Sequence, residues 1–174
     1  MRFNLETKID PTRPDETVDA ATFARMAVAA IRDAGFMERA TLQSFDWRTL
    51  IEARKIAPAL RTACLSIETA NNDTIKPVGD AASPWTAGLD VRKHDGSVPK
   101  LARAAGCAIW SPFWRNATPE RIAEAHALQL EVLPWTVNDP ADMARLIDAG
   151  ADGLITDYPD RLREVLRAKG IALP

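Results

Sequence analysis

Short apolar runs alternate along this chain with segments whose apolar residues recur at helical spacing. The apolar runs are the expected strands, at residues 3–9, 40–45, 61–67, 107–112, 131–137 and 153–156. Such alternation is typical of βα units with a parallel sheet, and nearly continuous hydrophobicity favours strands that are covered on both faces. The pattern predicts an α/β fold built from about six βα units.

Helix signals lie between the expected strands. Apolar residues recur at helical spacing over 23–31. Two further helices are expected where a capping side chain stands ahead of a proline, in Thr118-Pro119 and in Asn138-Asp139-Pro140. For the last helix we expect Asp157 or Asp160 to act as the cap.

Residues 68–99 break this alternation. The segment is rich in Asn, Asp, Gly and Pro and has little periodicity. A connection of this length is usually functional or mobile. Trp85 within it suggests partial packing over the mouth or an edge of the sheet.

Composition sets limits on the domain count and on the ligand. The chain has 174 residues, of which 47% are hydrophobic, and no flexible linker divides it, so we expect a single domain over 1–174. The net charge is −2 and basic residues are scattered, which argues against a nucleic-acid surface. We therefore expect a small ligand, no nucleic-acid partner and no transmembrane segment, while the compartment stays open.

The two cysteines lie in apolar stretches. Cys64 and Cys107 each sit within or beside an expected strand, where cysteine usually serves as a small buried hydrophobe. We expect buried thiols rather than a disulfide or a metal site.

Glu6 and Lys8 are the first candidates for chemistry. They lie two apart in an expected strand, so their side chains project from the same face. A carboxylate beside an ammonium suits a site that holds a divalent cation together with a phosphate. On the residues alone, a surface ion pair is the simpler interpretation.

Further polar and aromatic candidates lie in or just after two other expected strands, 40–45 and 131–137. Ser44 has no nearby histidine to activate it, so we do not expect a nucleophile there, and Asp46 is expected to cap a helix. Phe45 and Trp135 are candidate pocket walls, with core filling as the alternative for Trp135. Asn138 is expected to be a cap first and a ligand contact second.

The chain has two histidines, and neither is a strong catalytic candidate. His94 lies beside Asp95 in the long irregular segment, away from Glu6. His126 belongs to an expected outer helix and should be solvated.

Four segments together resemble the glycerophosphodiester phosphodiesterase family. They are Asn4-Leu5-Glu6-Thr7-Lys8, Leu42-Gln43-Ser44-Phe45-Asp46-Trp47, Leu133-Pro134-Trp135-Thr136-Val137-Asn138-Asp139-Pro140, and Gly150-Ala151-Asp152-Gly153-Leu154-Ile155-Thr156-Asp157-Tyr158-Pro159. The resemblance implies an incomplete TIM-type (β/α) barrel, in which this chain supplies the third to eighth βα units.

The same resemblance implies roles for particular residues. Glu6 would bind a divalent cation, Mg²⁺ or Ca²⁺, and Lys8 would face the phosphate of a glycerophosphodiester. Phe45 and Trp135 would line the substrate pocket. The family's two catalytic histidines and its first acidic metal ligands lie ahead of the Glu-x-Lys strand, so we expect this chain alone to be nearly inactive.

Two hypotheses of different classes follow. The chain is part of a phosphodiesterase that releases glycerol 3-phosphate and an alcohol, or it is a non-catalytic domain that binds a phosphorylated ligand or a partner. In either case we expect strands 3–9 and 153–156 to be open edges of the sheet, which favour self-association.

Overall fold

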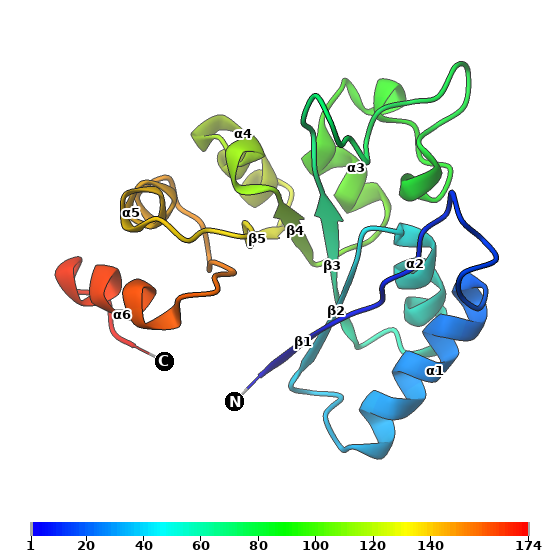
Figure 1. Ribbon diagram of the computed structural model, residues 1–174, viewed down its shortest axis with the longest axis horizontal. Helices are drawn as coiled ribbons and strands as arrows, with labels where there is room; N and C mark the ends of the chain where they lie inside the picture. Colours follow the sequence, from blue (N-terminus) through cyan, green and yellow to red (C-terminus); the bar gives the residue numbers. More distant parts are fainter. Residues whose placement is uncertain (1, 174) are drawn as a thin grey trace.

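The computed structural model describes residues 2–173, and its framework is a parallel sheet in which strand order follows chain order (Figure 1). The strands are β1 (Phe3–Glu6), β2 (Ala40–Ser44), β3 (Arg61–Ser66), β4 (Ile109–Pro112) and β5 (Glu131–Val132). Each strand pairs in parallel with the next. The expected α/β architecture is confirmed, but the strands are shorter than their apolar runs, most clearly β1, expected over 3–9, and β5, expected over 131–137.

Helices connect the strands and form an arc outside the sheet (Figure 1). They are α1 (Ala20–Asp33), α2 (Trp47–Ile56), α3 (Val98–Ala104), α4 (Pro119–Ala127), α5 (Pro140–Asp148) and α6 (Pro159–Ala168). Three short 3₁₀ helices, η1 (Pro84–Thr86), η2 (Val91–His94) and η3 (Trp114–Asn116), lie in the connections. Within residues 2–173, no helix has both the length and the apolar character that a membrane crossing requires.

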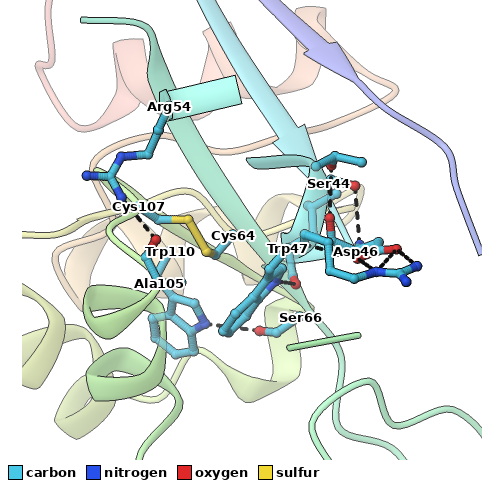
Figure 2. Close-up of a disulfide and its surroundings, with 12 residues drawn as sticks. Ser44, Asp46, Trp47, Arg54, Cys64, Ser66, Ala105, Cys107 and Trp110 are labelled. Carbon is cyan, nitrogen blue, oxygen red and sulfur yellow. Dashed lines mark hydrogen bonds and ion pairs between the residues drawn. A yellow bond between two sulfur atoms is a disulfide. The ribbon is translucent and has the colours of Figure 1, made fainter. Parts of the chain in front are cut away.

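The main core lies between the helices and the outer face of the sheet, and two tryptophans anchor it. Trp47 and Trp110 are fully buried. The indole N–H of Trp47 donates to the carbonyl of Leu65 at 2.9 Å, and that of Trp110 donates to the hydroxyl of Ser66 at 3.0 Å (Figure 2). Because buried N–H groups need partners, these two bonds fix α2 and β4 to the end of β3.

The expectation of free thiols is wrong, because Cys64 and Cys107 form a disulfide (Figure 2). Both side chains are buried, as expected, and their Cα atoms lie 5.9 Å apart. The pair is separated by 43 residues in the sequence. It meets only because β3 and β4 are neighbours in register, which apolar patterning alone does not specify.

The sixth strand, expected over 153–156, does not form as a regular strand. This segment is extended but irregular. Its backbone still pairs with the chain beyond β5: Ile155 N–H donates to Pro134 at 2.9 Å, and Val137 N–H donates to Ile155 at 2.8 Å. Pro134 has no N–H to give to this neighbour, so the pairing between the two segments lacks a bond there.

The sheet does not close into a barrel within residues 2–173. β1 pairs with β2 alone and forms one end of the strand order, while the irregular 153–156 segment lies beyond β5 at the other end. The arc of helices opens between the two chain ends (Figure 1). This is the incomplete barrel that the sequence predicts, and self-association through its edges stays a prediction.

We expect the disulfide to contribute substantially to stability. Replacing both Cys64 and Cys107 with alanine should lower the free energy of unfolding by about 4 kcal/mol, because a cross-link over this loop length removes that much chain entropy from the unfolded state. Urea unfolding of the oxidised chain and the double variant measures the difference. Equal midpoints, or two thiols that react with a thiol reagent in the native chain, would contradict the assignment.

Candidate active site

Glu6 and Lys8 lie where β1 ends, at the carboxyl ends of the parallel strands. Their side chains project to the same side, and Glu6 Oε1 lies 3.7 Å from Lys8 Nζ. The Lys8 side chain is 83% exposed and that of Glu6 is 23% exposed, so the ammonium reaches solvent while the carboxylate sits deeper. In βα barrels this end of the sheet is where active sites are built.

The residue between them determines their direction. Thr7 is buried, and its hydroxyl lies 2.9 Å from the hydroxyl of Thr49 in α2. Its N–H donates to Gln43 at 3.0 Å, and its carbonyl accepts from the hydroxyl of Ser44 at 2.8 Å. With Thr7 held against the helix layer, strand alternation turns Glu6 and Lys8 to the opposite, inner side.

Ser44 and Asp46 have structural roles. The sequence predicts no nucleophile at Ser44 and a helix cap at Asp46. The hydroxyl of Ser44 is fully buried, donates to Thr7 and accepts from the Asp46 N–H. Asp46 caps α2 by accepting from the Arg48 N–H at 3.0 Å, and it also binds the Arg48 guanidinium. That hydrogen bond raises the pKa of Arg48. Neither side chain is free to act on a ligand.

An aromatic wall faces the Glu6–Lys8 pair. The rings of Phe45 and Trp135 meet edge to face, with centroids 5.2 Å apart. The indole N–H of Trp135 donates to the carbonyl of Ser111 at 2.8 Å. Since its polar edge is bonded to β4, Trp135 offers apolar ring surface to the cavity.

All four site residues expected from the sequence line one cavity. Glu6, Lys8, Phe45 and Trp135 surround a space of about 260 Å³ whose remaining walls come from neighbouring strand ends. Glu6 ends β1, Lys8 and Phe45 lie just beyond β1 and β2, and Trp135 lies beyond β5. The arrangement places a cation, a carboxylate and an apolar wall around a volume that fits a small polar molecule.

A second cavity, of about 350 Å³, adjoins the first. It shares Glu6, Lys8 and Phe45 and adds Trp85 together with the connection between β1 and α1. The ring of Trp85 lies 6.5 Å from that of Phe45, edge to face. The expectation that Trp85 packs over the mouth is therefore confirmed.

The β1–α1 connection contributes charged residues that the sequence analysis missed. Asp10, Arg13 and Glu16 line the second cavity. Arg13 Nε donates to Asp10 at 3.0 Å, and its Nη1 donates to Glu16 at 2.9 Å. Their position in the chain could have indicated them, because the loops that follow the carboxyl ends of barrel strands build the site.

Hydrogen bonds hold the long 68–99 segment in place around Trp85. The hydroxyl of Ser83 donates to the carbonyl of Thr74 at 2.6 Å and accepts from the N–H of Trp85 at 3.3 Å. Arg92 donates to the carbonyls of Gly79 and Asp80. The segment is thus a folded cover, and η1 presents Trp85 to the mouth.

The chain matches a known family. A model of the glycerophosphoryl diester phosphodiesterase family matches residues 1–161. This chain belongs to that family. A glycerophosphodiester phosphodiesterase of Caldanaerobacter subterraneus is 28% identical over 143 residues, which are 82% of this chain and 49% of that protein. The chain thus spans about half the length of this relative.

Solved structures agree on the fold. The crystal structure of a putative glycerophosphoryl diester phosphodiesterase from Silicibacter pomeroyi has a TM-score of 0.79 and 33% identity, covering 99% of this chain and 52% of that one. An Oleispira antarctica phosphodiesterase, solved in complex with the product sn-glycerol-3-phosphate, has a TM-score of 0.64 and 16% identity, covering 96% and 56%. The second likeness is one of fold alone.

Two helix caps expected from the sequence, those of α5 and α6, are wrong. Asp139, not Asn138, caps α5, accepting from the N–H groups of Ala141 and Asp142. Asn138 instead bonds to the segment ahead of α6, where its amide donates to Asp157 at 2.9 Å. Neither Asp157 nor Asp160 caps α6, because the residue before this helix is Tyr158, which makes no side-chain cap bond. Local spacing could not reveal that these two loops face each other.

Neither histidine lines either of the two cavities. His126 is exposed, as expected, and its Nε2 lies 2.9 Å from Asp152, whose carboxylate also accepts from the Val132 N–H. His94 ends η2 and lines neither cavity. Over residues 2–173, no three His, Cys, Asp or Glu side chains gather as a metal cluster.

We expect the Thr7–Thr49 hydroxyl pair to be needed for stability. Thr49→Val keeps the side-chain volume but removes the hydroxyl that bonds to the buried Thr7 hydroxyl and donates to the Asp46 carbonyl, which should cost about 1–3 kcal/mol. Thr49→Ser retains the hydroxyl and should cost less. Urea unfolding of both variants measures this, and a larger loss for Thr49→Ser than for Thr49→Val would show that the methyl group, not the bond, matters.

Proposed function

We propose that this chain supplies one side of the active site of a phosphoric diester hydrolase that converts glycerophosphodiesters to glycerol 3-phosphate and an alcohol. Family membership supports the reaction class. The observation that carries the proposal is the shared cavity of Glu6, Lys8, Phe45 and Trp135 at the carboxyl ends of the strands.

Each side chain has a role that its chemistry suits. The exposed ammonium of Lys8 compensates phosphate charge as a mobile point charge. The ring surface of Trp135, packed on Phe45, provides an apolar wall for the carbon backbone of a glycerol group. The Oleispira antarctica relative, which holds sn-glycerol-3-phosphate, supports this choice of ligand.

We propose Glu6 as a ligand of a divalent cation. Carboxylate oxygen suits Mg²⁺ and Ca²⁺, and Mg²⁺ is commonly held by one or two carboxylates together with substrate phosphates. In the described part of the chain Glu6 stands without a cluster of further acidic ligands. The fit is therefore limited to one ligand, and bound cation would supply charge stabilisation at the phosphate.

Apart from Glu6 and Lys8, no described side chain that lines the Trp135 cavity can act as an acid or a base. Both histidines lie elsewhere, and the nearby Ser44 and Asp46 are committed to structural bonds. A positioned acid or base contributes about 10²–10⁴-fold to rate. We therefore propose that the 174-residue chain by itself hydrolyses substrate negligibly.

The same observation favours a second candidate function. A cavity with one ammonium, one carboxylate and an aromatic wall, but no histidine, is sufficient to bind a phosphorylated ligand without cleaving it. The two candidates differ in turnover and not in binding.

Activity measurements separate these possibilities. The 174-residue chain should hydrolyse glycerophosphocholine negligibly with Mg²⁺ or Ca²⁺. A chimaera that adds the N-terminal region of the Silicibacter pomeroyi relative should turn it over, and Glu6→Ala in that chimaera should reduce turnover by about 100-fold or more. Lys8→Ala should cause a smaller loss because phosphate charge is less compensated.

Matched controls come from α2. Lys55 and Glu52 form an exposed ion pair there, outside both cavities, so Lys55→Ala and Glu52→Ala should leave turnover unchanged. Strong metal-dependent turnover by the 174-residue chain, unaffected by Glu6→Ala, would contradict the site. Binding of glycerol 3-phosphate by calorimetry, without turnover in either protein, would favour the binding function.

A further inference from the structure

The second cavity has no ligand group assigned to it in the proposed function, and it shares a wall with the first. Glu6, Lys8 and Phe45 line both spaces. A phosphodiester has two arms joined at one phosphate, so a phosphate beside Lys8 can extend one arm into each cavity. If the Trp135 side takes the glycerol arm, the Trp85 side is left for the alcohol arm.

Charge on the Trp85 side favours a cation. Asp10 and Glu16 face Arg13 there and Glu6 faces Lys8, so without a bound metal ion the lining carries one negative charge in excess of the cations. Asp10 accepts two hydrogen bonds from Thr12, and these lower the pKa of its carboxyl. The carboxylate therefore stays ionised at neutral pH.

The hydrogen-bonding state of Asp10 argues against a neutral polyol. Its two oxygens already accept from the Thr12 N–H, the Thr12 hydroxyl and Arg13 Nε. A carboxylate offers about four acceptor positions, so little capacity remains for ligand hydroxyls. A quaternary ammonium group needs no hydrogen-bond partner, only a negative field and aromatic surface.

Aromatic surface is present on the same side. Trp85 and Phe45 both line the cavity, with their rings at 81° to each other. Trp is the aromatic residue that attracts cations most strongly through its ring face, and choline-type ligands are recognised in this way.

We propose that the Trp85 cavity is the subsite for an alcohol that carries a quaternary ammonium group, as choline does, and that Trp85, Asp10 and Glu16 select it over neutral or anionic alcohols. This inference rests on the proposed hydrolase function for its meaning in catalysis. The binding that it describes does not require turnover.

Choline and its neutral isostere 3,3-dimethylbutan-1-ol provide the sharpest comparison, because they share shape and differ in charge. Ligand-observed NMR on the methyl protons, with the 174-residue chain, should give an affinity for choline about fivefold higher than for the neutral alcohol. Equal affinities, or no binding of choline, would overturn the proposal.

Variants test which residues are responsible. Trp85→Leu should weaken choline binding about fivefold, and Trp85→Phe should retain it within about twofold, because a ring remains. Glu16→Gln should weaken it and Arg13→Gln should strengthen it, by about twofold each, as the excess charge changes. Tyr158→Leu removes an exposed aromatic outside both cavities and should have no effect. Loss with Tyr158→Leu, or none with Trp85→Leu, would overturn the assignment.

The activity of the chimaera distinguishes this inference from the proposed function. Comparable turnover of glycerophosphocholine and glycerophosphoglycerol, without choline binding, would leave the hydrolase in place and reject the cationic subsite. Choline binding without hydrolysis of any glycerophosphodiester would reject the hydrolase and keep the subsite as a binding site.

Discussion

The direction of the Glu6–Lys8 pair depends on the burial of one threonine between them. Thr7 is held from three sides, by the Thr49 hydroxyl, by the Ser44 hydroxyl and by the ladder bond to Gln43. A shift of one residue would turn both charges into the apolar helix layer, where unpaired charge is very costly. The hydrogen bonds of Thr7, one through its side chain and two through its backbone, thus determine which face of β1 carries the chemistry.

The middle of the sheet supports this arrangement from behind. β3 is the central strand, and its end receives the indole N–H groups of Trp47 and Trp110. The disulfide fastens the same strand to Cys107, two residues ahead of β4. Ser111 follows Trp110 in β4, and its carbonyl accepts a hydrogen bond from the Trp135 indole N–H, which orients the cavity wall. Core packing and cavity shape are therefore built on the same strands.

Sequence patterning predicts what depends on local order and fails where two distant segments meet. Strand and helix positions, the Asp46 cap and the direction of Glu6 and Lys8 follow from periodicity and alternation. The disulfide and the bond between Asn138 and Asp157 do not, since each joins segments brought together by the sheet. The charged residues after β1 were predictable in position but not in role.

In the proposed reaction, the two arms of the substrate meet elements of different kinds. Glu6, Lys8 and Trp135 belong to strand ends or their direct continuation, which the core fixes, while Trp85, Asp10 and Glu16 belong to connections. Phe45 contacts both tryptophans, so it is the only described ring that touches both sides. Because loops tolerate substitution better than strands, the preference for an alcohol can change in this fold while the phosphate-facing residues stay in place.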